Sequence, residues 1–138
     1  MDDMTFEKIL SENDVGETGS HQAGMHVPKG TNREFIDFLP FLDPEKYNPD
    51  CFLTCCDENG FNWQFRYVFY NNKLHGQGTR NEYRLTHMTK YLRNAKKGDV
   101  ISLKGQPKSG VFKVAIRKVA PQMARPITVQ LRGWERKY

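Results

Sequence analysis

Residues 61–70 contain the pattern that most constrains how this chain can fold. Aromatic side chains stand at every second position, and polar or aliphatic side chains stand between them. The aromatic positions are Phe61, Trp63, Phe65, Tyr67 and Phe69. Alternation with a period of two is typical of an antiparallel strand that has one buried face. We therefore predict that this strand runs through the core of the protein.

Several other segments fit short strands, because Gly, Pro and Asn interrupt the apolar runs roughly every eight to twelve residues. Two short helices are expected at residues 31–39 and 86–92, each with a side chain that can cap its first turn. The expected strands are 5–10, 23–28, 51–56, 61–70, 100–104, 111–119 and 127–132. Such a pattern is typical of a barrel or sandwich. The fold class is therefore mainly β (α+β), with a single domain over residues 1–138.

Charge is distributed unevenly along the chain. Residues 1–62 hold 13 of the 16 Asp and Glu but only four of the 21 Lys and Arg, a formal charge of −9. Residues 63–138 hold the other 17 basic and three acidic side chains, a formal charge of +14. A surface built from such a basic half favours an anionic partner, and nucleic acid is a common one. The alternative is a lysine-rich surface that has no partner.

The sequence lacks the motifs of the common catalytic sites. It contains no phosphate-binding GxxxxGK[ST] loop, no GxSxG nucleophile elbow and no HExxH zinc motif. A metal-dependent nuclease would need clustered carboxylates with a lysine. The one motif of that kind, Glu135-Arg136-Lys137, is expected to lie in a frayed tail. We therefore expect no catalysis, no metal and no cofactor in this chain.

Cysteine usage and hydropathy indicate the compartment. Cys51, Cys55 and Cys56 are an odd number of thiols, which does not fit a disulfide framework. Their CxxxCC spacing is not that of a known zinc site, so we expect reduced, structural thiols. No apolar run approaches the ~18 residues of a membrane span, and the N-terminus has no secretory signal. The expected location is the cytoplasm, with no membrane partner.

Residues 10–28 form a polar loop in which glycines recur between two apolar runs. Glycine allows a backbone with positive φ and a close approach to a partner. His21 and Gln22 lie inside this loop and could donate to bases, while Lys8 or Lys29 could contact phosphate. These side chains could equally serve only to order the loop.

Residues 76–84 form a second polar segment. In an extended chain, Arg80, Glu82 and Arg84 project to one side and the residues between them project to the other. Arginine can pair bidentately with guanine and glutamate can accept from cytosine N4, so this edge could read a G·C-rich step in a major groove. The alternative is a surface ion-pair ladder that contributes little.

The aromatic residues of segment 61–69 allow a different function. Aromatic side chains on an exposed sheet face can stack on the bases of single-stranded DNA or RNA. Five aromatic residues on one face of an alternating strand are, however, more often core residues. A single-strand-binding module is therefore kept as the alternative function.

Four motifs resemble, in the same order, those of a known family. They are LSENDVGETGSHQAGMHVP (residues 10–28), NPDCFLT (48–54), FYNN (69–72) and GTRNEYRLT (78–86). From about residue 8 to residue 104 the chain resembles the N-terminal effector-binding domains of EcoRII-type restriction endonucleases. The resemblance implies a DNA-binding, seven-stranded pseudobarrel of the B3-like kind with two short helices.

The resemblance also implies how such a domain grips duplex DNA. An N-arm, about residues 13–26 here, and a C-arm, about residues 77–84, would enter the major groove from opposite sides of the site. The residues that match DNA contacts of the family, or lie in the same motifs, are Lys8, His21, Gln22, Arg80, Asn81, Glu82 and Arg84.

Some positions depart from the family pattern. His26 stands at an aromatic contact of the N-arm, Tyr83 stands where the family has a lysine, and an extra residue near Gln77 and Gly78 replaces another lysine. These changes affect the expected phosphate contacts more than the base-reading ones. The complete set of predicted DNA-binding residues is Lys8, Asn13, His21, Gln22, His26, Lys73, Arg80, Asn81, Glu82, Tyr83 and Arg84.

A domain of this kind would belong to a longer enzyme. By resemblance, the chain would be the recognition or effector domain of a prokaryotic type II (IIE) restriction endonuclease. It would bind CCWGG or a related site in double-stranded DNA as a monomer and without a cofactor. Cleavage would belong to a C-terminal nuclease domain of the parent chain, which would use Mg²⁺.

Overall fold

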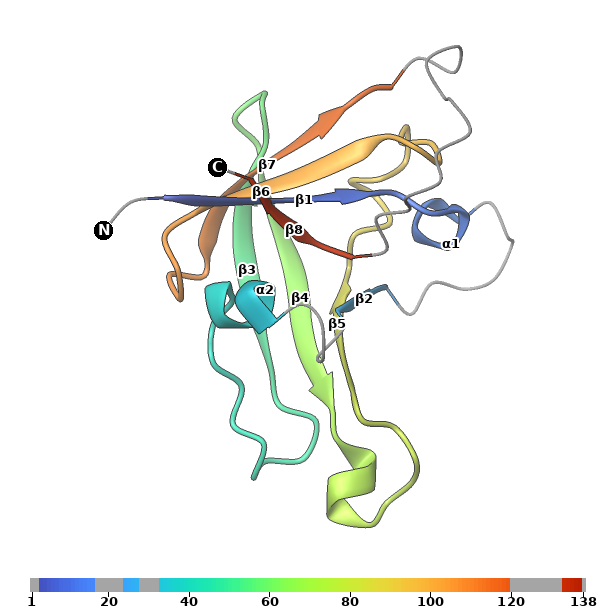
Figure 1. Ribbon diagram of the computed structural model, residues 1–138, viewed down its shortest axis with the longest axis vertical. Coiled ribbons are helices and arrows are strands. Elements are labelled where there is room, and N and C mark those ends of the chain that lie inside the picture. The colour runs from blue at the N-terminus through green and yellow to red at the C-terminus, as the bar shows by residue number, and fades with distance from the viewer. Residues whose placement is uncertain (1–2, 17–23, 28–32, 120–132, 138) are drawn as a thin grey trace.

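The computed structural model describes residues 3–16, 24–27, 33–119 and 133–137. These residues form one eight-stranded sheet that curls into an open half-barrel, with two short α-helices and one 3₁₀-helix (Figure 1). The strand order is β2-β5-β4-β3-β7-β6-β1-β8. The elements are β1 (Met4–Ile9), α1 (Glu12–Val15), β2 (Met25–Val27), α2 (Arg33–Phe38), β3 (Asp50–Cys56), β4 (Asn62–Tyr70), η1 (Asn72–His75), β5 (Glu82–Thr86), β6 (Val100–Gly105), β7 (Val111–Arg117) and β8 (Glu135–Lys137).

The mainly β class with two short helices is confirmed, and the sheet contains one strand more than the seven expected. Neighbouring strands are antiparallel except for β3 and β7, which run parallel. None of the helices in the described ranges is long and apolar enough to cross a membrane.

Strand β4 lies between β3 and β5 and has the predicted alternation. Phe65, Tyr67 and Phe69 are buried, whereas Arg66 and Tyr70 on the other face are partly exposed. The prediction that this aromatic face belongs to the core is confirmed for these three rings.

Phe61 differs from the other aromatic residues of this segment, because it is 66% exposed and precedes β4. Asp57 explains the difference. Its side chain accepts hydrogen bonds from the backbone N–H groups of Asn59 and Phe61 and from Trp63 Nε1, at 2.8, 3.0 and 2.9 Å. The bond from Trp63, together with the backbone donors, lowers the pKa of Asp57. Phe61 therefore belongs to the β3–β4 turn, which this carboxylate organises.

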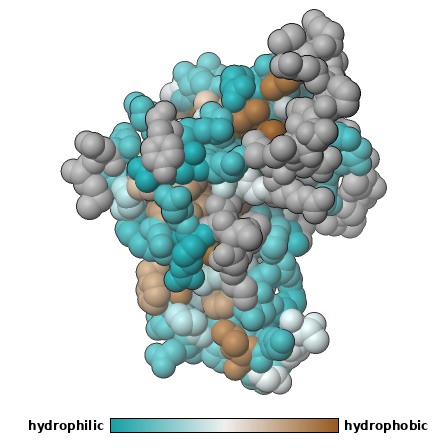
Figure 2. Space-filling model, viewed as in Figure 1, coloured by the Kyte–Doolittle hydropathy of each residue, from teal (hydrophilic) through white to brown (hydrophobic). Residues whose placement is uncertain are grey.

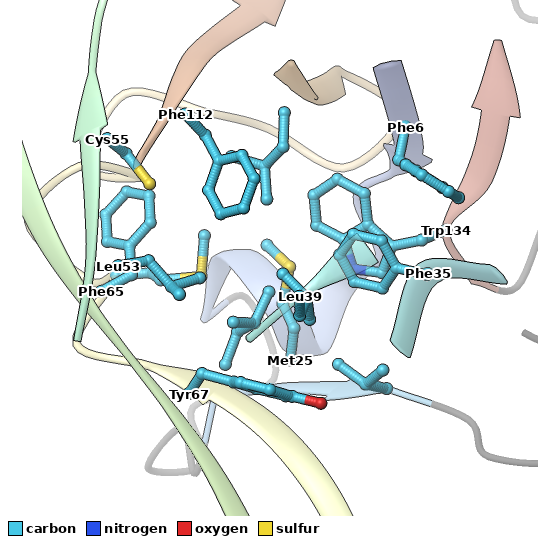
Figure 3. Close-up of a cluster of buried hydrophobic side chains, with 14 of the residues drawn as sticks. Phe6, Met25, Phe35, Leu39, Leu53, Cys55, Phe65, Tyr67, Phe112 and Trp134 are labelled. Atoms are coloured by element: carbon cyan, nitrogen blue, oxygen red, sulfur yellow. The ribbon is translucent and has the colours of Figure 1, made fainter. Parts of the chain in front are cut away.

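The core fills the concave side of the sheet, where side chains from strands β1 to β7, α2 and the segment before β8 meet (Figure 3). Trp134 stacks on Phe35 of α2 with ring centroids 4.6 Å apart, and Phe35 contacts Phe6 of β1 at 5.1 Å. Each of these rings is at most 1% exposed. The aromatic contacts therefore join α2 and the C-terminal segment to the sheet.

The three cysteines are free thiols, as expected. Cys55 is fully buried and Cys56 is half-buried, in agreement with their opposite orientations on β3. Burial raises the pKa of Cys55 to about 12. This thiol is therefore protonated at neutral pH and unreactive, which supports a packing role.

The expected frayed tail at residues 135–137 is a wrong prediction. These residues form β8, which pairs with β1 in the register Thr5 to Lys137 and Glu7 to Glu135. Trp134, just before β8, is buried and holds the segment against the core. No local sequence pattern predicts this contact. The strand expected at residues 127–132 lies outside the described residues.

The helix expected at residues 86–92 is also wrong. Thr86 is the last residue of β5, and His87 takes a positive φ of 63°. A single helical turn follows, in which Leu92 N donates to Met88 O at 2.9 Å. Met88 and Leu92 are buried as expected, but strand pairing with β2 and β4 outweighs the local capping signal at Thr86. The helix α1, by contrast, lies in a stretch that we expected to be a loop.

Asn71 fixes the root of the long β4–β5 connection, which projects beyond the rest of the sheet (Figure 1). It is 0% exposed. Its Oδ1 accepts from Asn48 N at 2.7 Å, and its Nδ2 donates to Pro44 O and Lys46 O at 3.0 and 2.7 Å. In η1, Asn72 Nδ2 also donates to the Tyr47 hydroxyl at 2.7 Å. The connection is therefore braced against the loop that precedes β3.

We expect Asn71→Ala to lower the free energy of unfolding by about 2–3 kcal/mol, because it leaves a buried N–H and two carbonyls without their partner. Urea unfolding monitored by tryptophan fluorescence measures this change. Gln64→Ala is a suitable control, since it removes one exposed hydrogen bond, to Thr54 Oγ1, and should cost less than about 1 kcal/mol. Equal losses for the two variants would contradict a bracing role for Asn71.

Candidate nucleic-acid interface

Arg80, Glu82 and Arg84 lie on one side of β5 and the segment leading into it, as predicted. Arg80 Nε donates to Glu82 Oε1 at 3.0 Å, and Arg84 Nε donates to Glu82 Oε2 at 2.9 Å. One carboxylate thus holds two guanidinium groups. We call these three residues the arginine ladder.

The arginine ladder continues across β4 to β3. The Arg80 guanidinium carbon lies 3.7 Å from the centroid of the Tyr70 ring, a cation–π contact. Arg66 Nη1 donates to the Tyr70 hydroxyl at 3.4 Å, and Arg66 Nε donates to Asp50 Oδ2 at 2.6 Å. The hydrogen bond with Asp50 raises the pKa of Arg66. Together these groups form a polar network on the outer face of the sheet.

Sequence reasoning missed Arg66 and Tyr70 as members of this network. Both lie on the face of β4 opposite the buried aromatic residues, so the alternating pattern predicts that they are exposed. The contact of Tyr70 with Arg80 depends on the register between β4 and β5, in which Tyr70 lies opposite Glu82. That register could not be derived from the motif.

The chain returns from the predicted N-arm at Gly24, directly beside the arginine ladder. Arg84 Nη1 donates to Gly24 O at 2.8 Å. Gly24 has a φ of 91°, and a Cβ at this position would lie 2.1 Å from Leu85 O. Only glycine fits here. His26 follows on β2, is exposed and pairs in register with Arg84.

The chain enters the N-arm from α1, which is held in place by two short-range contacts. Ser11 caps the helix by accepting from Asp14 N at 3.2 Å, and Asp14 Oδ2 accepts from Ser11 N at 2.9 Å. The same carboxylate forms an ion pair with Lys8. Lys8 is 6% exposed, so the predicted phosphate contact of this residue would require its ammonium group to leave Asp14. That contact stays a prediction.

The other predicted site residues occupy different places. Asn13 is exposed on α1, and Lys73 is exposed on η1. Tyr83 lies on the opposite face of β5 from the arginine ladder and stacks on Phe69 with ring centroids 4.3 Å apart. Asn81, two residues before Tyr83 in the chain, is partly buried. His21 and Gln22, like residues 17–23 as a whole, lie outside the described residues.

Glu82 has a low pKa in this arrangement. Burial alone would raise the pKa of its carboxyl, but the hydrogen bonds from Arg80 and Arg84 and their positive charges outweigh burial and lower it. The ladder therefore carries one negative and two positive charges at neutral pH. It presents a net positive charge on a face that is otherwise mixed.

Residues 1–102 match the protein family described as restriction endonuclease EcoRII, N-terminal. The chain belongs to this family. The type II restriction enzyme EcoRII of Escherichia coli is 35% identical over 85 residues. The matched region is 57% of this chain and 19% of that relative, so the chain spans about a fifth of the length of the curated relative it matches.

The EcoRII N-terminal match includes every element of the candidate interface. It begins before β1 and ends inside β6, so it contains α1, β2, β4 and the arginine ladder. β7 and β8 lie beyond it. The resemblance inferred from the four sequence motifs is thus confirmed at the level of the family.

We expect NMR titration of the Glu82 side-chain carboxyl to give a pKa below the ~4.3 of an unperturbed glutamate. The stability that this carboxylate contributes is fully present above the unfolded pKa and is lost as the pH falls through the lower folded pKa. Arg84→Gln should raise the Glu82 pKa, whereas the distant Lys104→Gln should leave it unchanged. A titration that responds equally to both substitutions would contradict the ladder.

Proposed function

We propose that this chain binds double-stranded DNA sequence-specifically and is the recognition domain of a longer type II restriction endonuclease. The arginine ladder is the observation that carries this proposal. It joins two arginines and one glutamate, the side chains best suited to guanine and cytosine edges in the major groove, within a family named for the N-terminal part of EcoRII.

The hydrogen bonds within the ladder leave donors and acceptors for bases. Arg80 uses Nε for Glu82, and among the described residues no acceptor is bonded to its two terminal nitrogens. Each carboxylate oxygen of Glu82 accepts one arginine N–H and has a second lone pair for a cytosine amine. Since the guanidinium groups are already oriented by Glu82 and Tyr70, less side-chain entropy is lost when they meet a base.

We further propose that the two arms read the bases together. The C-arm, residues 77–84, would present the arginine ladder, and the N-arm, residues 13–26, would present His21 and Gln22 from the opposite side. The site would be CCWGG or a related sequence, bound by a single copy of the chain without a cofactor. The family departures at His26 and Tyr83 leave room for a related site. Cleavage with Mg²⁺ would belong to a nuclease domain elsewhere in the parent enzyme.

Single-strand binding by the aromatic strand is less well supported. Phe65, Tyr67 and Phe69 are at most 4% exposed, so bases could not stack on them without opening the core. The face seen in Figure 2 is dominated by hydrophilic side chains, and its hydrophobic residues form small separate patches.

Binding to a duplex that contains CCWGG should exceed binding to a scrambled duplex roughly a thousandfold at ~150 mM salt. Arg80→Ala and Glu82→Ala should each reduce this discrimination by about 1–3 kcal/mol, because each removes a base contact. Fluorescence anisotropy with both duplexes measures the two affinities. Lys113→Ala, an exposed lysine on β7, should leave the discrimination unchanged.

Two outcomes would reject parts of this proposal. Equal affinity of the unmodified chain for both duplexes would reject CCWGG as the site. Equal losses on both duplexes for the Arg80 and Glu82 variants would reject base readout by the ladder. Stronger binding to a single strand than to a duplex would favour the alternative function.

A further inference from the structure

A cavity of about 280 Å³ lies at the root of the N-arm. It is formed where the end of α1, the returning chain before β2 and the turn after β5 meet, and Figure 1 shows α1 beside the segment that follows β5. We call it the junction cavity. Its lining includes Asp14, Val15, Gly24, His87, Lys90 and Arg93.

The junction cavity is directly connected to the arginine ladder. Gly24 lines the cavity and its carbonyl accepts from Arg84 Nη1 at 2.8 Å. His87, also in the lining, stacks on Phe52 of β3 with ring centroids 5.7 Å apart and an interplanar angle of 9°. Phe52 lies on the same face as Arg66, its partner in the β3–β4 register. The cavity therefore continues the outer face on which the ladder lies.

Two cations at the cavity have no acidic partner within the described part of the chain. Lys90 and Arg93 are exposed, and neither forms an ion pair there. Among the described residues of the lining, Asp14 is the one acid, and its side chain is only 6% exposed and is paired with Lys8. The described part of the cavity lining therefore carries a net positive charge, because the carboxylate of Asp14 is already paired with Lys8.

The turn that carries these cations has fixed anchors. Met88 and Leu92 are 3% and 5% exposed, and Leu92 N donates to Met88 O at 2.9 Å. Arg93 N also donates to Lys90 O at 3.3 Å. Lys90 and Arg93 are thus held at one side of the cavity by a turn that is rooted in the core.

We infer that Lys90 and Arg93 at the junction cavity bind backbone phosphate of the same DNA duplex whose bases the arginine ladder reads. This inference rests on the proposed function and adds a site outside the predicted DNA-binding residues. A phosphate here would lie beside both ends of the N-arm, since α1 ends at Val15 and the chain returns at Gly24. Phosphate contacts fix the position of a protein on the duplex without reading its sequence.

The test is the salt dependence of duplex binding by the double variant Lys90→Gln/Arg93→Gln. Loss of two phosphate contacts should reduce the slope of log K against log salt by about 1.8, since each contact contributes about 0.9. The affinities for CCWGG and scrambled duplexes should fall by the same factor, so the preference between them should persist. Circular dichroism at the same temperatures checks that the variant is folded.

Two further variants distinguish the effect of a local phosphate site from the effect of the total charge of the protein. Lys104→Gln/Lys113→Gln removes the same charge from a cross-strand pair of exposed lysines on β6 and β7 and should change the slope much less. The exchange Lys90→Arg/Arg93→Lys keeps both charges and should retain the slope of the unmodified chain. Equal slope changes in the two charge-removing variants would overturn the inference.

The inference and the proposed function fail in different ways. Duplex binding that keeps its full salt slope in Lys90→Gln/Arg93→Gln would overturn the phosphate site and leave the proposed function standing. A selective loss on the CCWGG duplex would also overturn it, because a backbone contact carries no sequence preference. Absence of duplex binding by the unmodified chain would overturn both.

Discussion

The alternation of side chains along β4 is the constraint on which both the core and the candidate interface depend. Phe65, Tyr67 and Phe69 fill the concave side of the sheet, while Arg66 and Tyr70 contact the polar network on the outer side. Because a shift of one residue would exchange these two sets, burial of the three rings also fixes which side chains face outward. The same strand pairs with β3 and β5. The register between β4 and β5 therefore determines which β4 side chains lie beside the arginine ladder.

The two predicted arms differ in sequence, but each has, near or before its start, a polar side chain that hydrogen-bonds to nearby backbone groups. The β4–β5 connection, which leads into the C-arm, begins at Asn71, whose side-chain amide bonds to the loop before β3. The N-arm begins at α1, where Asp14 joins Ser11 and Lys8. In both places a short polar side chain satisfies neighbouring backbone groups and ties a connection to the sheet. Anchoring of this kind can hold the ends of a surface connection in place while the sequence of the connection varies.

The match to the EcoRII N-terminal family covers the candidate interface. The match ends inside β6, and every element that we connect with recognition precedes that point. The basic half of the sequence contributes unequally to the candidate interface. Arg80, Arg84 and the turn with Lys90 and Arg93 adjoin the place where the N-arm joins the sheet, whereas the lysines of β6 and β7 lie across the sheet. Net charge alone does not distinguish these two groups.

The sequence by itself determined the mainly β class, the buried aromatic face of β4, the common side of Arg80, Glu82 and Arg84, and the family. These properties follow from local periodicity and contiguous motifs. Only the tertiary structure decided the pairing of β8 with β1, the loss of the expected helix after Thr86, and the contacts of the ladder with Tyr70 and Gly24. Each of these depends on strand register or on burial against distant residues, and a local pattern contains no information about its partner across the sheet.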